Sequence, residues 1–432
     1  MLRSLAHHRG GAAASGLVAF IGTVLVTAMA ALLATGFSDT THVADRSFLT
    51  QFPIILGGWV VAIVLFAMVS TVGVALAGRA GEIAGLRLVG ATPRQVQTRI
   101  AGETLTVATI AAVPGLAVGL LTGAFVLDRM HDAGLIGSGT VYAPGAALPV
   151  IAALLVLVVS VVAAWIGSRT LAARSPVADP EPTALGGRGG DRFRRTAAVV
   201  LLIAGLGSSS AVLGMDADSI LTTAMTGPAV VLVAVGLCML ATELLALANR
   251  LGRAGASAPG HVARINVSVV PRRIRPLVTF LTLFVGISAG TLAMQDVENR
   301  HAVPGGTAQL LAAINYLVVV LIAAFMAIAL TNNLVASIGQ RRTEFATMSL
   351  VGSTRAQTLR MLLREVGTGI AASVVAGTIG AMACVVPFAV AKTGSPAAAF
   401  APLPYAAAVV VGAVIALLAA ALAGKRVIRT AA

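Results

Sequence analysis

Two segments of the chain share one pattern of charged, glycine and hydroxyl residues. Residues 79–103 read RAGEIAGLRLVGATPRQVQTRIAGE, and residues 341–365 read RRTEFATMSLVGSTRAQTLRMLLRE. At a constant offset of 262 residues, nine of the 25 positions are identical. The identical pairs are Arg79/Arg341, Glu82/Glu344, Ala84/Ala346, Leu88/Leu350, Val89/Val351, Gly90/Gly352, Thr92/Thr354, Gln95/Gln357 and Glu103/Glu365. Such self-similarity indicates an internal duplication, and a surface feature that occurs twice is suited to docking a partner.

Each copy predicts that one helix ends and that a second helix starts only a few residues later. Gly90 suits the left-handed conformation that ends many helices. Thr92 and Gln95 have the spacing of a capping box, and Pro93 takes the favoured first helical position. The second copy places Gly352, Thr354 and Gln357 at the same points. We call the helix–turn–helix expected at 79–103 the first elbow and that at 341–365 the second elbow.

The motifs of nucleotide binding and hydrolysis are missing from the sequence. It holds no Gly-x-x-x-x-Gly-Lys-Ser/Thr stretch, and its only lysines are Lys392 and Lys425, so a P-loop is excluded. It also lacks a Gly-x-Ser-x-Gly elbow, a His-Glu-x-x-His helix and a Cys/His cluster. Cys238 and Cys384 fall within apolar runs and are expected to be small buried hydrophobic residues. We therefore expect no cofactor on this chain, and any ATP and magnesium on a separate polypeptide.

The composition excludes a water-soluble protein. Of the 432 residues, 58% are hydrophobic and 11% are charged, whereas soluble domains carry roughly 25% charged residues. The net charge of +14 could suggest nucleic-acid binding, but the basic residues form short clusters between apolar stretches. Clusters of that kind are typical of the cytoplasmic loops of membrane proteins. The sequence thus predicts an integral membrane protein with no nucleic-acid partner.

Ten apolar runs are long enough to cross a bilayer as helices, which takes about 20 residues each. They lie near 16–37, 53–77, 104–127, 147–167, 196–214, 224–246, 277–294, 309–336, 367–390 and 405–423. The first could be a signal peptide, but it is longer than a typical one and is better interpreted as an uncleaved span. With both termini inside, 26 of the 30 Lys and Arg residues fall in cytoplasmic segments. This asymmetry favours ten spans in an all-α protein without a large soluble domain.

The elbows would then lie on the cytoplasmic side. Ile83, Leu86 and Val89 continue the apolar periodicity of the preceding run, so that helix is expected to project into the cytosol. The second helix of each elbow carries arginines on its solvent face, namely Arg94, Arg99, Arg360 and Arg364. One interpretation is an ordinary basic loop that only orients the protein. Two agreeing copies favour a rigid docking feature instead.

Few ionisable groups lie within the runs. Glu243 is the only acid there, near the cytoplasmic end of its run and close to Arg250, so an ion pair or interfacial placement is favoured over proton coupling. Asn315, Asn332 and Asn333 suit interhelical hydrogen bonds, with substrate contact as the alternative. The scarcity of membrane charges argues against a secondary transporter.

The pattern Arg-x-x-Glu followed by Leu-x-Gly-Ala/Ser-Thr and a final Glu resembles the FtsX-like permease domain of ABC transporters, the superfamily of the MacB, Lol and Bce-type permeases. The resemblance covers about 53–170 and 309–425, and ten spans in one duplicated chain are most similar to the Bce-type layout. It implies a first permease half at 1–175 with four spans, a linker with two bridging spans at 176–265, and a second half at 266–432. Unlike those families, the chain has only short segments, 38–52 and 295–308, where a large external domain usually stands.

In the family that the chain resembles, the elbow is a coupling helix that docks on a cytosolic ATPase. The resemblance therefore implies a set of ATPase-coupling residues in each elbow. These are Glu82, Leu86, Val89, Gly90, Ala91, Thr92, Arg94 and Gln95 in the first, and Glu344, Met348, Val351, Gly352, Ser353, Thr354 and Gln357 in the second.

The function that follows is an ABC permease subunit of a bacterial cytoplasmic membrane. Two copies of a separate ATPase would drive export or membrane extraction of a hydrophobic or amphipathic compound, with antimicrobial-peptide or antibiotic resistance implied by the resemblance alone. The alternative is a membrane subunit that moves no solute and signals to a sensor kinase or a cell-wall hydrolase. The short external segments weigh against that alternative.

Overall fold

The computed structural model describes residues 9–431, apart from 78–79, 133, 135, 138, 173–187, 218–219, 253–256, 302–315, 317–319, 321–326, 328–329, 332 and 336. All regular elements among these residues are helices. The chain forms two compact units, Met1–Leu185 and Gly186–Ala432. We describe each unit separately.

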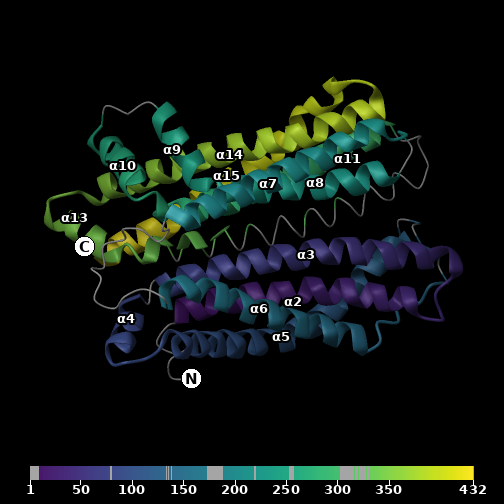
Figure 1. The fold of residues 1–432 in the computed structure, drawn as a ribbon, viewed down its shortest axis with the longest axis horizontal. Coiled ribbons are helices and arrows are strands. Elements are labelled where there is room, and N and C mark those ends of the chain that lie inside the picture. The colour runs from purple at the N-terminus through teal and green to yellow at the C-terminus, as the bar shows by residue number, and fades with distance from the viewer. Residues whose placement is uncertain are drawn as a thin grey trace. The chain divides into compact units, whose positions relative to one another are not determined.

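The first unit is a bundle around one central helix (Figure 1). Its elements are α2 (Arg9–Phe37), α3 (Val43–Ala77), α4 (Ala80–Leu88), α5 (Pro93–Asp132) and α6 (Ala147–Ala172). Helix α2 packs against α3, α5 and α6. Helix α2 supplies much of the core of the unit.

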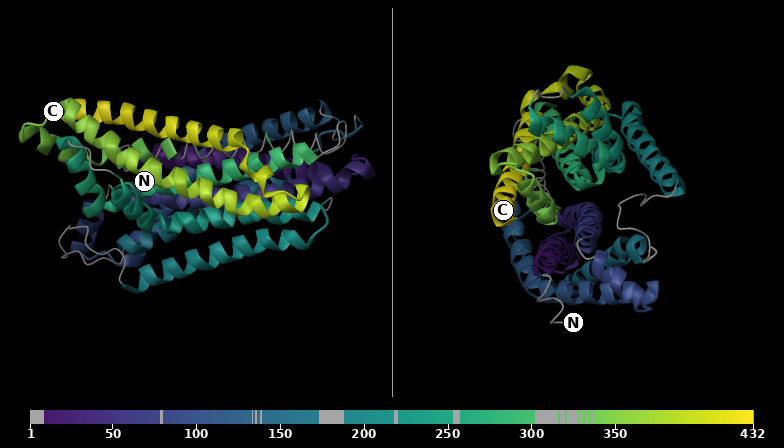
Figure 2. Two further views of the ribbon diagram at one scale, coloured as in Figure 1. Left: turned by 90° about the horizontal axis from the view of Figure 1, so that it is seen from above. Right: turned by 90° about the vertical axis from the view of Figure 1, so that its left-hand side faces the viewer.

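The second unit repeats that plan with additional helices. Its elements are α7 (Arg188–Ala211), η1 (Val212–Gly214), α8 (Ile220–Met239), α9 (Ala241–Leu251), α10 (Ala258–Val269), η2 (Pro271–Arg273), α11 (Arg275–His301), α13 (Arg342–Leu350), α14 (Arg355–Thr393), η3 (Pro396–Phe400) and α15 (Pro402–Ala431). The central helix is α11, which packs against α14, α8 and α15. Figure 2 shows α14 and α15 running side by side in this unit.

Most of the predicted spans are present as long apolar helices. Seven qualify among the described residues, and the bent pair formed by α8 and α9 makes an eighth if it is one span. The seven are Ser15–Phe37, Pro93–Asp132, Ala147–Ser168, Asp191–Gly214, Arg275–Arg300, Arg355–Thr393 and Pro396–Thr430. Helix α3 covers the predicted run 53–77, whereas 309–336, with Asn315 and Asn332, lies largely outside the described residues. The protein is therefore a multi-pass all-α membrane protein, and the count of ten spans stays a prediction.

The run at 224–246, predicted as one span, is bent. Helix α8 ends at Met239, and α9 leaves it at an angle of 69°. Glu243 lies just after this bend, where Arg194 and Arg195 of α7 both approach its carboxylate at 2.8 Å. The expected ion pair of Glu243 is confirmed, but its partners are these two arginines and not Arg250.

The short segments expected outside the membrane extend neighbouring helices. Residues 43–52 form the first turns of α3, and residues 295–301 form the last turns of α11. In the first unit Asp45 accepts hydrogen bonds from the Thr140 hydroxyl at 2.6 Å and from the Gly137 N–H at 3.0 Å. These contacts fasten the start of α3 to the segment before α6. We call this end of each unit the far end, and the end with α4 or α13 the elbow end.

Small residues let α2 and α5 pack closely. Gly115, Gly119 and Gly123 lie one turn apart on α5 and face α2. A Cβ atom added at Gly119 would stand 2.7 Å from the Thr27 Cβ and 2.9 Å from the Val24 carbonyl oxygen. Such close approach of backbones is typical of helix pairs in membranes. The pair α11 and α14 of the second unit is similarly close, since a Cβ at Gly377 would lie 3.0 Å from the Gly286 nitrogen.

This packing predicts opposite effects of alanine at two helical glycines. Gly119→Ala should destabilise the protein by roughly 1–3 kcal/mol, because the added methyl group overpacks the α2–α5 contact. Gly207→Ala on α7, where an added Cβ meets nothing within 4 Å, should be neutral or stabilising by up to about 1 kcal/mol. Unfolding of the purified chain in a detergent titration measures both. Equal effects at the two positions would contradict the close packing at Gly119.

Candidate functional site

The first elbow is a tight turn between α4 and α5. Gly90 has a φ of 100°, the left-handed conformation predicted for it. The Gly90 N–H donates to the Arg87 carbonyl at 3.1 Å and the Ala91 N–H to the Leu86 carbonyl at 3.0 Å, which is the hydrogen-bond pattern of a Schellman motif. The Thr92 N–H then donates to the Gln95 side chain at 2.8 Å. The turn therefore provides hydrogen-bond partners for backbone groups at the end of α4 and at the start of α5.

The second elbow, between α13 and α14, repeats this geometry. Gly352 has a φ of 94°. The Gly352 N–H donates to the Ser349 carbonyl at 3.1 Å and the Ser353 N–H to the Met348 carbonyl at 3.0 Å. The side chains of Thr354 and Gln357 each accept a backbone N–H of the other in a complete capping box. Corresponding hydrogen bonds in the two elbows agree within about 0.1 Å, so the sequence repeat is also a structural repeat.

Both elbows expose apolar side chains at their tips. Val89 is 89% exposed and Val351 is 83% exposed, and the preceding leucines, Leu88 and Leu350, are exposed as well. Large apolar side chains at this degree of exposure indicate a contact surface when they recur together at one feature. We call Leu88 and Val89, and likewise Leu350 and Val351, the apolar tips.

The inner face of the first elbow fixes it to its unit. Ile83 of α4 and Val96 and Ile100 of α5 are buried in one cluster with Val72 and Leu76 of α3. Burial of an aliphatic side chain contributes about 1.5–3 kcal/mol, so the elbow is held as a rigid extension of the bundle. In the second elbow the buried Phe345 holds the position that corresponds to Ile83.

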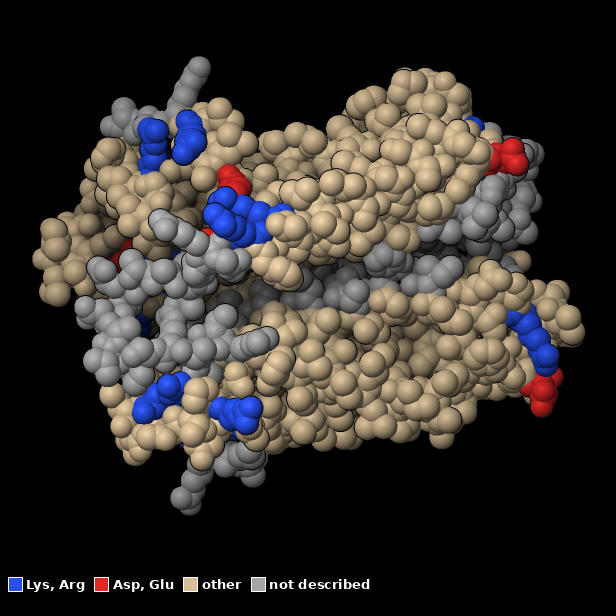
Figure 3. Space-filling view, in the orientation of Figure 1, with Lys and Arg blue, Asp and Glu red and all other residues tan. Residues whose placement is uncertain are grey.

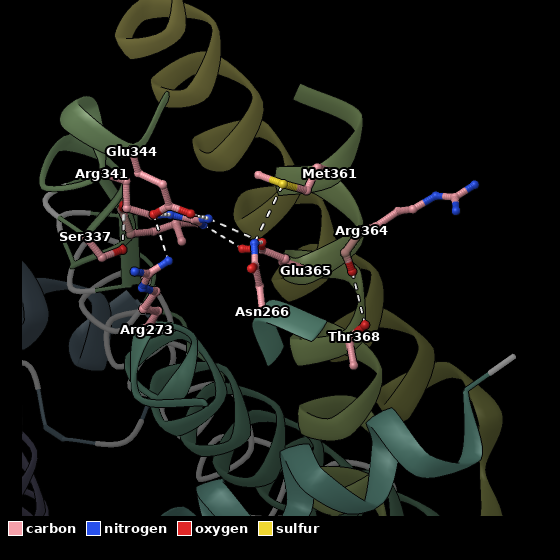
Figure 4. Close-up of polar contacts among 10 residues, drawn as sticks. Asn266, Arg273, Ser337, Arg341, Glu344, Met361, Arg364, Glu365 and Thr368 are labelled. Atoms are coloured by element: carbon pink, nitrogen blue, oxygen red, sulfur yellow. Dashed lines mark hydrogen bonds and ion pairs between the residues drawn. The ribbon is translucent and has the colours of Figure 1, made fainter. Parts of the chain in front are cut away.

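A network of charged groups, which we call the polar node, holds the second elbow (Figure 4). Arg341 donates to Glu365 of α14 at 2.5 Å and to Glu344 of α13 at 3.1 Å. Arg273 of η2 donates to Glu344 at 2.7 Å, and Asn266 of α10 donates to Glu365 at 2.6 Å. The node thus joins four elements at the base of the elbow.

Arg341 and Glu344 of the polar node shift each other's pKa against the effect of burial. Burial would raise the pKa of Glu344, but the hydrogen bond and charge of Arg341, with those of Arg273, lower it below its usual value. Desolvation would lower the pKa of Arg341, but the carboxylates of Glu344 and Glu365 raise it. Since removal of one partner leaves a buried charge uncompensated, the node fixes α13 relative to α14.

The predicted coupling residues fall into two groups, exposed and half-buried. The exposed residues are Glu82, Val89, Gly90, Thr92, Arg94, Gln95, Val351, Gly352, Thr354 and Gln357. Leu86, Ala91, Glu344, Met348 and Ser353 are half-buried. Most members of each set lie at the turn of their elbow, whereas Glu82 and Glu344 lie in the first turn of α4 and α13. Asn266 and Arg273 were missed, because they lie outside the repeated segment and carry no motif.

The second elbow differs from the prediction in how it begins. The periodicity at Ile83, Leu86 and Val89 predicts that the preceding helix continues into the first elbow, and the repeat extends this to the second, but α13 starts as a separate helix after a turn at Gln340 and Arg341. The Arg341 N–H donates to the Ile338 carbonyl in this turn, and its guanidinium reaches Glu344 and Glu365. In the first elbow the corresponding residues 78–79 lie outside the described part of the chain.

Comparison with known families decides the identity of the fold. The FtsX-like permease C-terminal domain matches the chain twice, at residues 54–176 and 316–432, and each match contains one elbow. The chain belongs to the FtsX-like permease family. Comparison with curated proteins found no match. The permease family is one of ABC-transporter membrane subunits, which work with a cytosolic ABC ATPase.

Proposed function

We propose that the two elbows of this permease are the docking sites for two copies of its ATPase. The observation that carries the proposal is the same Schellman turn and capping box built twice, each with an exposed apolar tip. Orienting a loop in the membrane requires only its positive charge. A rigid turn with exposed valine and leucine is better explained by contact with a partner.

The long helices that follow the elbows could carry a displacement of the elbows across the membrane. Helices α5 and α14 have 40 and 39 residues, so each is about 60 Å long and roughly twice as long as a 30 Å hydrocarbon core requires. The first two turns of α5 are fixed to α4 by apolar burial, and the third turn of α14 is fixed to Arg341 and α13 by the polar node. A displacement of either elbow by the ATPase would therefore move a helix that crosses the whole membrane.

The substrate that we propose is a hydrophobic or amphipathic compound, exported or extracted from the membrane. The short far-end segments give no external domain to capture a soluble solute, and the chain has few charged groups within its spans. Resistance to an antimicrobial peptide or antibiotic is the physiological role that this chemistry would serve. We place the elbows and both termini in the cytoplasm of a bacterial cell, because 26 of the 30 basic residues then lie inside.

The test is purification of the full chain with its ATPase, followed by reconstitution into vesicles. We expect a P-loop ATPase bound at two copies per chain, ATP hydrolysis that needs both proteins, and ATP-dependent movement of an amphipathic probe. A full chain that is active without an ATPase would contradict the proposal. Hydrolysis without any flux would support signalling across the membrane instead of transport.

A further inference from the structure

Helix α10 presents three different stripes along its length. Gly260, Ala263 and Val267 are buried, on the side that packs against α14. A second stripe is apolar and exposed, and consists of Val262, Ile265 and Val269. A third is polar and exposed, and consists of His261, Arg264 and Ser268. The spacing of three or four residues within each set places it on one side of the helix.

Helix α9 continues the exposed apolar surface. Leu247 and Leu251 are exposed and lie one turn apart, and Arg250 beside them is exposed as well. The Asn249 side-chain amide donates to the Arg264 carbonyl at 3.2 Å, which holds the two helices together. The exposed arginines therefore come from neighbouring places on two helices, each beside an apolar stripe.

The charge of this segment has one sign. Residues 244–275 contain six arginines and no aspartate or glutamate. Glu243, which precedes this segment, is paired with Arg194 and Arg195, and Glu344, which pairs with Arg273 of the segment, is also bound by Arg341. Figure 3 shows exposed basic side chains over α9 and α10. The surface therefore complements an anionic partner that also has an apolar interior.

The segment lies at the elbow end of its unit, beside a membrane span. Asn266 of α10 contacts Glu365 near the start of α14, and α11, a candidate span, begins at Arg275, six residues after α10 ends. A helix at the end of a span, with an apolar stripe beside a polar one that carries an arginine, has features of helices that lie in the headgroup region of a bilayer.

We infer that α9 and α10 form an interfacial platform that binds anionic phospholipid. Arg250 and Arg264 would contact the phosphates, and Leu247, Leu251, Val262, Ile265 and Val269 would lie among the upper acyl chains. Basic residues near an anionic surface each strengthen such binding substantially. Because Asn266 of the same helix belongs to the polar node, lipid bound to the platform would share one element with the second elbow.

The depth of α10 in the bilayer is tested with a matched pair of positions. Ile265→Cys and Ser268→Cys are labelled with the environment-sensitive dye NBD in the full chain, with the unsubstituted chain as the blank because Cys238 and Cys384 are buried. In vesicles of phosphatidylcholine and phosphatidylglycerol, chain-labelled doxyl lipid should quench the dye at 265 at least threefold more than at 268. Equal quenching, or protection at 265 only when the ATPase is added, would overturn the inference.

The charge preference is tested by native mass spectrometry of the full chain with added lipid. Arg250→Gln with Arg264→Gln should reduce bound phosphatidylglycerol about tenfold relative to phosphatidylcholine, and lysine at both positions should retain it. Lys425→Gln with Arg426→Gln removes two exposed charges from the end of α15 and should have little effect. No change in the first variant, or equal loss in the second, would contradict the inference. Neither experiment requires the ATPase, so failure here would leave the docking proposal standing.

Discussion

Replacing Val89 and Val351 together by aspartate should abolish ATPase binding and reduce ATP hydrolysis by the purified complex to background. Each substitution places a charge at the apolar tip of an elbow, where contact with the ATPase would bury it. Burying an unpaired carboxylate costs several kcal/mol per ion, so each ATPase copy should bind its altered elbow about 100-fold more weakly or worse. Co-purification and ATP hydrolysis measure this. The single variants should each lose one of two bound copies.

The control for this prediction is Val43→Asp. Val43 is 84% exposed, like the tip valines, but lies at the far end of α3. That variant should bind the ATPase normally, and all four variants should unfold like the parent chain, because exposed side chains contribute little to stability. A fully active complex that contains the double variant would contradict the docking role of the tips.

Replacing Arg341 by methionine should destabilise the permease by roughly 3–5 kcal/mol, because Glu365 would be left buried without its cation. The Arg341 side chain is 9% exposed and that of Glu365 is 1% exposed. The second elbow should detach from α14, so one of the two ATPase copies should bind weakly. Detergent unfolding and the stoichiometry of the complex check the two effects.

A double variant distinguishes the loss of the ion pair from a non-specific loss of stability. Arg341→Met with Glu365→Met removes both charges and should recover much of the loss, since buried pairs are often replaceable by apolar residues. Glu344 keeps Arg273 as its partner in this variant. The exposed pair Arg129 and Asp132 provides a comparison, and Arg129→Met should cost only about 0–1 kcal/mol. Similar costs for Arg341→Met and Arg129→Met would show that the node does not hold the elbow.

The features predicted correctly from the sequence depend on neighbouring residues. Gly90 and Gly352 adopt the left-handed turn, and both capping boxes form, because a helix end is decided within about six residues. Long apolar runs became long helices for a similar reason, since the bilayer requires an unbroken hydrogen-bonded segment. The family could also be recognised, because its signature lies within each elbow.

The features that the sequence did not reveal depend on contacts between distant residues. The 69° bend after Met239 occurs within an apolar run that looks continuous in the sequence. Arg194, about 50 positions earlier, forms an ion pair with Glu243, which lies just after the bend. The polar node joins Asn266 and Arg273 to carboxylates about 70 to 100 residues later. Periodicity cannot identify such partners, because it reports only which face of one helix is apolar.

The most direct test of the docking proposal is site-specific crosslinking in intact membranes. A photoreactive benzoylphenylalanine is placed at position 89, 351 or 43 of the full chain, and adducts are identified by mass spectrometry. We predict adducts with the ATPase from positions 89 and 351 and none from position 43. An ATPase that co-purifies with the chain but crosslinks at neither tip would contradict the proposal that the elbows are its docking sites.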